Sequence, residues 1–291
     1  MLLLGAHISI GAGFSAAANK IGGDYRCNVM QIFTKSPQGG QVKAINAEDA
    51  ARFRELRDRY GIRAVIAHSS YLLNLAKPLE SVPWMENNIL QDFERLAVLG
   101  GDGVIVHIGK ALASDRDAAI HTVIENAKRI INATAKLTSA SGRPLEYILE
   151  NTAGQGSEIG YLFEELSLIW KGLRGFSPRL RVCLDTAHAW GAGYDLGTKK
   201  GALETLRLYD QTVGLETLAC FHFNDSKKNR GSRVDRHDNI GSGLIGLAGL
   251  TEIAKYAKLK SIPLILETPE QSGTERLEDI KKVRAMVDES A

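Results

Sequence analysis

The segment FHFNDSKKNRGSRVDRHDNIGSG, Phe221–Gly243, begins at the end of an apolar run and continues as a polar loop rich in basic residues. The apolar run, LACFHF, has the composition of a buried strand and places His222 near its end. Asp235 and His237 stand two residues apart in the loop, so on an extended segment their side chains point the same way and can bind one ion together. Metal-type ligands beside basic groups suit a phosphate ester better than a neutral substrate.

Seven other apolar runs resemble the one that ends at His222, and all are too short to be helices. The eight runs are Leu2–His7, Val29–Phe33, Ala64–His68, Val104–His107, Tyr147–Glu150, Val182–Asp185, Ala219–His222 and Leu264–Glu267. Segments with helical patterning connect them: Ala47–Tyr60, Trp84–Leu99, Asp115–Thr138, Tyr161–Leu173, Thr198–Val213, Leu247–Ala257 and Thr274–Val287. Eight strands alternating with helices predict an α/β fold, a closed (β/α)8 TIM barrel, in which residues 1–291 form a single domain and the active site lies where the strands end.

The strand ends carry an unusual set of side chains. Four of the seven histidines end a strand, and they are His7, His68, His107 and His222. Three carboxylates do the same: Glu150, Asp185 and Glu267. His188 and His237 are expected in loops just past the sixth and seventh strands, and His121 on the surface of a helix. Because the ends of barrel strands meet at one face, the side chains at the strand ends should lie together.

Imidazoles and carboxylates in one place form sites for zinc or a similar transition ion. Singly, each has a simpler interpretation: His7 as a buried polar group, or each carboxylate as the cap of the next helix. Three carboxylates together without a cation would repel one another strongly. The candidate ligands are His68, His107, Glu150, Asp185, His188, His222, Asp235, His237 and Glu267. They are too many for one ion and enough for two or three that share a carboxylate, an arrangement suited to phosphodiester hydrolysis.

Two further segments are candidates for contact with nucleic acid. The loop after His222 carries Lys227, Lys228, Arg230, Arg233 and Arg236, which either bind phosphate or form an ordinary solvated loop. In the segment SSYLLN, Ser69–Asn74, Tyr71 and Leu72 either insert into a nucleic-acid groove or pack on the barrel rim. Gln31 and Lys35, around the second strand, are weaker candidates for phosphate contact.

Composition limits the remaining possibilities. The net charge is only +2, so any contact with a polyanion must be local. Cys27, Cys183 and Cys220 show no CxxC spacing and are expected to be buried free thiols in a reducing compartment. The start, MLLLGAHIS, lacks the pattern of a signal peptide, and no apolar run approaches the roughly 18 residues that span a membrane. We therefore expect a soluble, intracellular protein that acts as a monomer without membrane contact.

Several segments resemble those of the endonuclease IV family of apurinic/apyrimidinic endonucleases. They are ILENTAGQG (148–156), CLDTAHAWGAGYDL (183–196), HFNDSKKNRGSRVDRHDNIGSG (222–243) and LILETP (264–269), with GAHIS, QIFTKSP and HSSYLLNL near the start. The resemblance covers essentially the full length. It implies a (β/α)8 barrel with three zinc ions that hydrolyses the phosphodiester 5′ to an abasic site in duplex DNA, leaving a 3′-hydroxyl and a 5′-deoxyribose phosphate. Cleaning of blocked 3′ ends is a further activity that the sequence leaves open.

Residue by residue, the resemblance implies three metal groups. His68, His107 and Glu150 would hold the first ion, Glu150 would share a second with Asp185, His222 and Glu267, and His188, Asp235 and His237 would hold the third. A hydroxide between the first two ions would be the nucleophile, and the third ion would stabilise the leaving oxygen, which makes Glu150, His107 and His188 the catalytic candidates. The DNA-contact candidates are Tyr71, Leu72, Gln38, Lys228, Arg230 and Arg233.

The sequence departs from the family pattern at three positions. Ile108 follows His107 where His-Pro-Gly is expected, which alters the loop and keeps the ligand. Gln38 falls where some members place an arginine in the DNA groove. Ser242 stands where a glutamate is common, and nothing in the sequence accounts for the change.

Sugar isomerases and epimerases of the xylose-isomerase type are the alternative. They also end strands on Glu, Asp, His and Glu around a single divalent metal, and Glu150, Asp185, His222 and Glu267 fit that set equally well. The five additional ligands and the basic loop favour the nuclease. A binding module without activity is the least favoured possibility, because it would leave many ligand-type groups at a barrel mouth unused.

Overall fold

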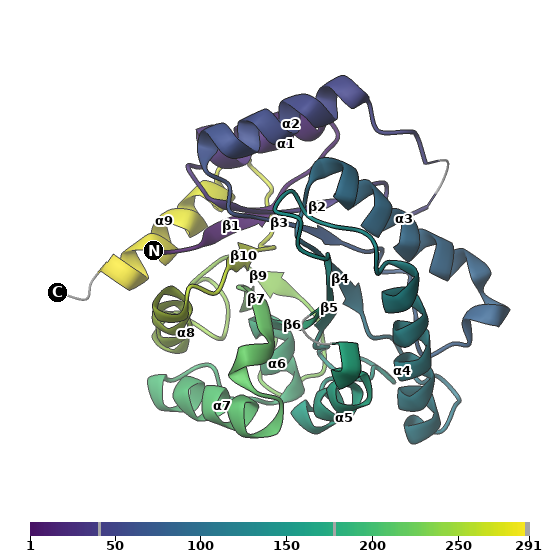
Figure 1. Ribbon diagram of the computed structural model, residues 1–291. Coiled ribbons are helices and arrows are strands. Elements are labelled where there is room, and N and C mark those ends of the chain that lie inside the picture. The colour runs from purple at the N-terminus through teal and green to yellow at the C-terminus, as the bar shows by residue number, and fades with distance from the viewer. Residues whose placement is uncertain (40–41, 177–178, 289–291) are drawn as a thin grey trace.

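The computed structural model describes residues 1–39, 42–176 and 179–288, and its centre is a closed barrel of parallel strands (Figure 1). The strands follow one another around the barrel in the order β1, β10, β7, β6, β5, β4, β3, β2. Their bounds are β1 (Leu4–His7), β2 (Val29–Phe33), β3 (Ala64–His68), β4 (Gly103–His107), β5 (Glu146–Glu150), β6 (Leu180–Asp185), β7 (Leu218–His222) and β10 (Leu264–Leu266). The predicted TIM barrel is confirmed, and each predicted run agrees with a strand to within two residues at either end.

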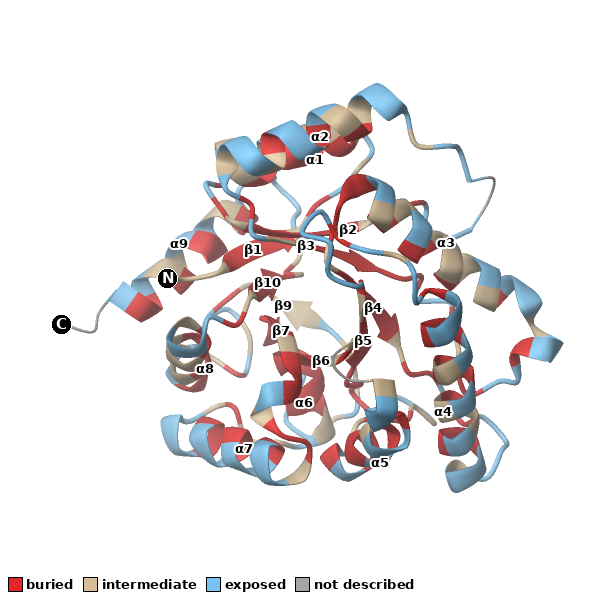
Figure 2. Cartoon of the chain, in the orientation of Figure 1, coloured by how far each residue is buried: buried red, intermediate tan, exposed pale blue. Residues whose placement is uncertain are grey.

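Helices surround the barrel and turn their buried faces toward the strands (Figure 2). The long helices are α2 (Ala47–Tyr60), α3 (Pro83–Leu99), α4 (Arg116–Ala133), α5 (Phe163–Leu173), α7 (Lys199–Thr212), α8 (Leu247–Lys260) and α9 (Glu275–Asp288). Side-chain caps fix some of the starts: the Asn46 oxygen accepts the N–H groups of Glu48 and Asp49 at the start of α2. Helix α4 ends earlier than predicted, because the chain turns there and the Arg179 guanidinium binds the carbonyl of Thr134.

Several short elements lie outside the sequence prediction because they are shorter than a periodic pattern can reveal. They are α1 (Phe14–Ala18), the π-helix η1 (Asn19–Asp24), the 3-10 turns η2 (Leu79–Ser81), η3 (Arg174–Phe176) and η4 (Leu215–Thr217), α6 (Thr186–Ala192), β8 (Asp225–Ser226) and β9 (His237–Asp238). Two of them correct the prediction that His188 and His237 lie in loops. His188 lies in α6, and His237 lies in β9, which pairs antiparallel with β8.

Alternate residues of the strands point into the barrel and form two layers. The lower layer is an apolar cluster of Val29, Ile66, Ile105, Ile148, Cys183, Cys220 and Ile265. Two residues further along the same segments come Gln31, His68, His107, Glu150, Asp185, His222 and Glu267. His7 follows Gly5 in the same way, and a Cβ at Gly5 would collide with the carbonyl of Val29. A packed apolar floor therefore supports a layer of polar side chains at the barrel mouth.

The remaining predictions about the whole chain can be checked directly. Cys27, Cys183 and Cys220 are free and buried, as predicted. In the described ranges, helices long and apolar enough to cross a membrane are absent.

Candidate metal centre

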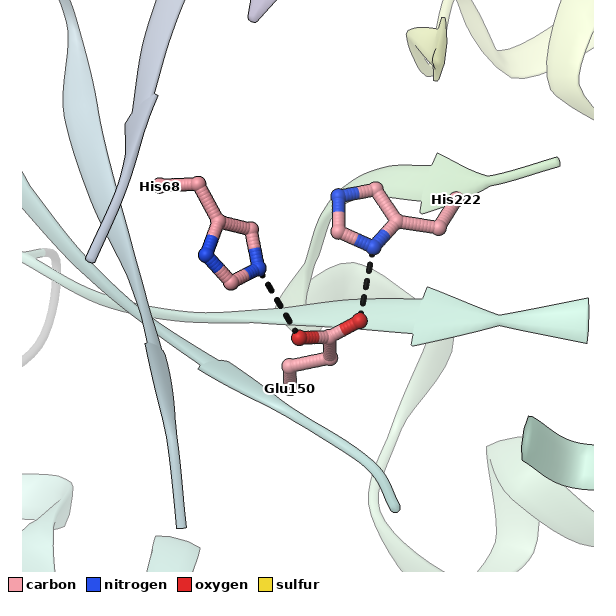
Figure 3. A group of neighbouring side chains, drawn as sticks. All are labelled: His68, Glu150 and His222. Carbon is pink, nitrogen blue, oxygen red and sulfur yellow. Dashed lines mark hydrogen bonds and ion pairs between the residues drawn. The ribbon is translucent and has the colours of Figure 1, made fainter. Parts of the chain in front are cut away.

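Glu150, at the end of β5, lies between His68 and His222 (Figure 3), and His107 and His188 are also within 4 Å of its carboxylate. Its Oε1 atom is 2.7 Å from Nδ1 of His222 and 3.6 Å from Nδ1 of His188. Its Oε2 atom is 3.2 Å from Nε2 of His68 and 3.4 Å from Nδ1 of His107. The Glu150 side chain is 1% exposed. One buried carboxylate thus faces imidazoles from four separate elements of the barrel, which suits a ligand shared between two ions.

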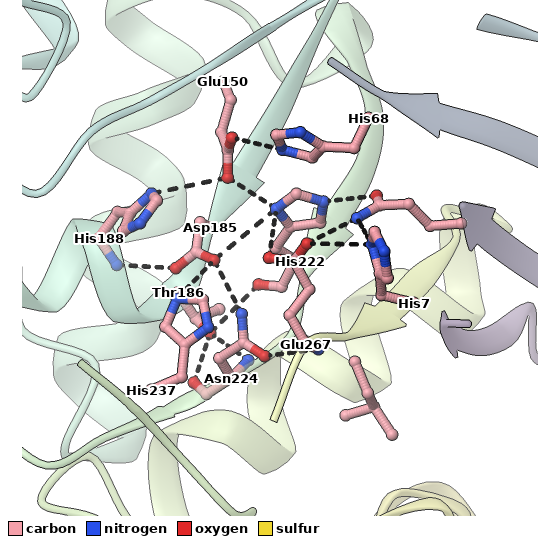
Figure 4. Close-up of polar contacts among 12 residues, drawn as sticks. His7, His68, Glu150, Asp185, Thr186, His188, His222, Asn224, His237 and Glu267 are labelled. Atoms are coloured by element: carbon pink, nitrogen blue, oxygen red, sulfur yellow. Dashed lines mark hydrogen bonds and ion pairs between the residues drawn. The ribbon is translucent and has the colours of Figure 1, made fainter. Parts of the chain in front are cut away.

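Asp185 joins this group to a second one because its two oxygens face different partners (Figure 4). Oδ1 accepts the backbone N–H of His188 at 2.7 Å, and this cap starts α6 directly after β6. Oδ2 accepts the side-chain amide of Asn224 and lies 3.5 Å from Nε2 of His237. The cap explains why His188 stands on a helix, and the carbonyl of Asn151, 2.8 Å from Nδ1 of His188, holds the ring in place.

The outer group of ligands comes from α6 and from the loop that follows β8. Oδ2 of Asp235 lies 3.3 Å from Nε2 of His188, and its Oδ1 lies 3.2 Å from Nε2 of His237. Asp235 stands two residues before His237, which begins β9, and the two side chains meet. This group is more open to solvent than Glu150, since the Asp235 side chain is 44% exposed.

The loop that carries Asp235 and His237 is held in place by Asp225, which begins β8. The buried Asp225 carboxylate accepts the backbone N–H groups of Ser226, Gly241, Gly243, Ile245 and Gly246. A Cβ at Gly243 would lie 2.5 Å from Asp225 Oδ1, so only glycine fits there. Residues 241–246 therefore fold around one carboxylate directly after β9, and the pairing of β9 with β8 places His237 opposite Ser226.

The electrostatics of the centre follow from burying acids and imidazoles together. Burial lowers the pKa of His222, but the Glu267 and Glu150 carboxylates outweigh burial and raise its pKa to about 10. The pKa of His188 is also raised, because Asp185 and Asp235 outweigh the opposing effect of burial. Burial alone would raise the pKa of Glu150, yet His222 and His107 hold that pKa well below its usual value. Without a metal cation, protons on His222 and His188 offset part of the carboxylate charge.

The donor set fits metal ions. Three groups of ligand atoms each lie within 4.8 Å of one another: His68, Glu150 and His222; Asp185, His188 and His237; and Glu150, Asp185, His222 and Glu267. Nε2 of His237 is buried and makes no hydrogen bond within the described part of the chain. Imidazole nitrogen with carboxylate oxygen is the ligand chemistry of zinc and related ions. The first group contains His222 where the resemblance implies His107, whose Nδ1 is nevertheless 3.4 Å from Glu150.

Tyr71 and Leu72 project from the loop after β3. They are 52% and 51% exposed, whereas the following Leu73 is buried. About half of the surface of each residue is therefore accessible to solvent. Gln38, in the neighbouring loop after β2, is also exposed.

Two weaker candidates from the sequence have other partners. Lys35 is buried and forms an ion pair with Asp92 while it donates to the carbonyl of Asn88, so it is not available to a phosphate. Gln31 is fully buried in the polar layer and contacts His222 and Glu267. Because the Gln31 side chain is fully buried, it does not reach a phosphate at the surface, which corrects the prediction of direct phosphate contact.

The basic loop is exposed at all five of its cationic residues. Three of the five have partners among the described residues: Arg230 lies 3.4 Å from Oδ2 of Asp195, the Arg233 guanidinium lies 4.8 Å from the centre of the Tyr161 ring, and Arg236 donates to the carbonyl of Asp235 at 2.6 Å. Arg233 also has a positive φ of 53°, an uncommon backbone conformation outside glycine. The loop is thus shaped by specific contacts on the same side of the barrel as the candidate ligands.

The comparisons with known proteins agree with this geometry. The model of the family described as "Xylose isomerase-like TIM barrel" matches residues 16–289. A probable endonuclease 4 from Geobacter sulfurreducens is 36% identical over 94% of this chain and 90% of its own length. The crystal structure of endonuclease IV from Thermus thermophilus is 33% identical, covers 99% of both chains and superimposes with a TM-score of 0.84. The chain belongs to the endonuclease IV family.

A more distant likeness concerns the fold alone. A D-tagatose 3-epimerase-like protein superimposes with a TM-score of 0.71 at 20% identity, over 99% of both chains. The barrel is therefore common to both enzyme classes, and the identity of the side chains at its mouth must decide between them.

Sequence patterns did not identify the residues that orient the ligands. Gln31, Asn224 and Asp225 are fully buried polar side chains beside the ligand groups. One signal could have found Gln31: it stands two residues after an inward-facing valine, as each strand-borne ligand stands two residues after an inward-facing apolar residue. Asp225 gave no signal, because its partners are backbone N–H groups up to 21 residues away.

Proposed function

We propose that this protein is a DNA-repair endonuclease that hydrolyses the phosphodiester 5′ to an abasic site in duplex DNA and leaves a 3′-hydroxyl and a 5′-deoxyribose phosphate. One observation carries the proposal. Besides the four residues that a single-metal epimerase would use, five more ligand-type side chains stand around the same mouth. They are His68, His107, His188, Asp235 and His237. A sugar epimerase has no use for them, whereas a phosphodiesterase that binds several ions does.

The metal groups follow from this proposal. His68, His107 and Glu150 would hold one zinc ion; Glu150, Asp185, His222 and Glu267 a second; and His188, Asp235 and His237 a third. When bound, such ions supply a nucleophile at neutral pH and neutralise charge at the oxygen that leaves. Glu150 keeps the first two groups in register because its two oxygens face histidines on opposite sides. His107 and His188 complete the first and third groups.

The DNA would lie across the mouth of the barrel. Tyr71 and Leu72 are exposed side chains of the kind that fill a gap in a base stack, and an abasic nucleotide is cheap to extrude because it lacks a base that stacks. Gln38 lies in the adjacent loop. Lys228, Arg230 and Arg233 would contact phosphates and hold the duplex in place.

Incision of a defined duplex tests the function. The substrate is a 5′-labelled duplex with one abasic site, and the control is the same duplex with a normal base pair. We expect a single cut on the 5′ side of the abasic site, with product ends that a polymerase extends directly because they carry a 3′-hydroxyl. Metal analysis of the same preparation should give three ions per chain, mainly zinc. A protein that leaves the duplex intact, binds one ion and epimerises a ketose would be a sugar epimerase instead.

A further inference from the structure

Gln31 is the residue of β2 that points into the polar layer, and its side chain contacts both a histidine and a carboxylate of the candidate metal centre. Its side chain is fully buried between β1, β7 and the end of β10. Oε1 lies 2.7 Å from Nε2 of His222. Nε2 lies 2.6 Å from Oε1 of Glu267 and 3.0 Å from Nδ1 of His7. A primary amide offers one carbonyl oxygen and two N–H groups, and all three are used.

These partners fix the orientation of the amide. Ionised Glu267 can only accept hydrogen bonds, so the nitrogen of Gln31 must face it and the oxygen must face His222. Nε2 of His222 therefore carries a hydrogen and donates it to Gln31. The other ring nitrogen, Nδ1, then points at Glu150 and Glu267 and faces the place of the proposed second ion. Gln31 orients both a histidine and a carboxylate of the second proposed metal group.

The same amide also sets the state of His7. The second N–H of Gln31 donates to Nδ1 of His7, so the neutral ring carries its hydrogen on Nε2. The ring packs against Phe33 with centroids 4.5 Å apart and is 18% exposed. Within the described residues, nothing accepts a hydrogen bond from Nε2. His7 lines a cavity of about 580 Å³, together with Phe33, Ser9 and Pro37, beside the metal centre.

We propose that Gln31 is a positioning residue that holds His222 and Glu267 for the second ion and fixes His7 as a hydrogen-bond donor, through Nε2, to an oxygen of the DNA backbone. The His7 part rests on the proposed function, because it needs a sugar-phosphate substrate at the mouth. The Gln31 part concerns metal binding and stands without it. Neither residue belongs to the nine candidate ligands.

The test of Gln31 measures metal, not turnover. Gln31→Met keeps the length of the side chain and removes all three hydrogen bonds, and Gln211→Met on the exposed face of α7 is the matched control. Zinc affinity is measured by competition with a chelator, and the visible spectrum of the cobalt-substituted protein reports ligand geometry. We expect Gln31→Met to bind one ion about 10- to 100-fold more weakly, with a changed cobalt spectrum. Wild-type affinity and spectrum in the folded variant would overturn the positioning role.

The test of His7 separates metal binding from substrate contact. His7→Ala should keep the wild-type zinc affinity and cobalt spectrum while kcat/KM on abasic duplex falls about tenfold, the effect of one lost hydrogen bond. His7→Gln, which restores an N–H donor, should recover part of the loss, and His121→Ala on the surface of α4 should behave as the wild type. Full activity of His7→Ala would overturn the donor role. A wild-type protein that does not incise at all would overturn the proposed function and this role together, and the metal measurements would still decide the role of Gln31.

Discussion

The strand-borne ligands of the centre and the loop-borne ligands differ in how they are held. Glu150, Asp185 and His222 end β5, β6 and β7, and their side chains are 1%, 0% and 0% exposed. Asp235 lies in the loop that follows β8 and His237 begins β9 at the end of that loop, and their side chains are 44% and 17% exposed. Barrel register fixes the first set, because each stands above a packed apolar residue. Backbone hydrogen bonds to Asp225 fix the second. Substitutions in the two sets should therefore have different effects on metal binding and incision.

The largest effect should come from Glu150, the centre of the strand-borne set. Glu150→Gln removes one charge and turns an N–H donor toward histidines, so both ions that share the carboxylate should bind poorly. We expect a loss on the order of 10³ in single-turnover incision, about 4 kcal/mol of transition-state stabilisation. The control is Glu204→Gln on the exposed face of α7. A folded Glu150→Gln protein with near-wild-type rate and metal content would show that Glu150 is not a shared ligand.

A pair of histidine variants compares the two sets directly. His107→Ala weakens the strand-borne set, which should supply the nucleophile, and His237→Ala weakens the loop-borne set, which should neutralise the leaving oxygen. Each should lose on the order of 10² or more in single-turnover incision, and His237→Ala should still bind abasic duplex. His121→Ala serves as the control, and thermal melting confirms folding. Near-wild-type rates in both folded variants would remove the three-metal model.

The same comparison explains how far the sequence could be interpreted. Strand-borne ligands were predictable because a short apolar run that ends in His or Glu specifies both a strand and a position at the barrel mouth. His188 and His237 were found as ligand candidates and assigned to the wrong elements, since α6 depends on the cap from Asp185 and β9 on pairing with β8. Gln31 and Asp225 act through partners far away in the chain, so no local pattern identifies them.

Asp225 should matter for the loop-borne set alone. In the wild type, several backbone N–H groups donate to the Asp225 carboxylate. Asp225→Asn replaces one carboxylate oxygen by an N–H donor that faces these N–H groups, which should lower the free energy of unfolding by about 1–3 kcal/mol. We expect the ion of Asp235 and His237 to bind about tenfold more weakly, while the ions at Glu150 keep their affinity. Asp238→Asn is the control, because among the described residues the Asp238 side chain accepts a single hydrogen bond, from the N–H of Asn239. Equal weakening of all ions would mean that Asp225 supports the whole barrel mouth.

Proton release should accompany metal binding at the strand-borne set. In the metal-free protein the pKa of His222 is raised to about 10, so the ring keeps its proton at pH 8, where an unfolded chain with a pKa of 6.5 has lost it. An ion at Nδ1 must displace that proton, so zinc affinity should rise with pH up to about 10, by up to about tenfold per unit for each proton released. Calorimetric titration of the metal-free protein at pH 8, in two buffers of different ionisation enthalpy, counts the protons. Binding without proton release would show that His222 is neutral before the metal arrives.

The smallest effect concerns the cationic side chains of the basic loop, which are neither candidate metal ligands nor part of the barrel. Lys228 and Arg230 are exposed beside the loop-borne ligands, and Arg230 is only partly engaged by Asp195. Each phosphate contact contributes about 0.9 to the slope of log affinity against log salt, so Lys228→Ala with Arg230→Ala should lower the slope by about 1.8.

The matched control removes Lys136 and Lys260, which are exposed at the opposite end of the barrel. Both double variants change the net charge by the same amount. If the electrostatic field of the whole protein attracts the DNA, the salt slope should fall in both variants, whereas local phosphate contacts should lower it only in the variant of Lys228 and Arg230. Binding of abasic duplex measured across a range of salt concentrations decides between them. Equal slopes in the two double variants would make the loop an ordinary solvated surface and leave the metal centre as the sole basis for the nuclease.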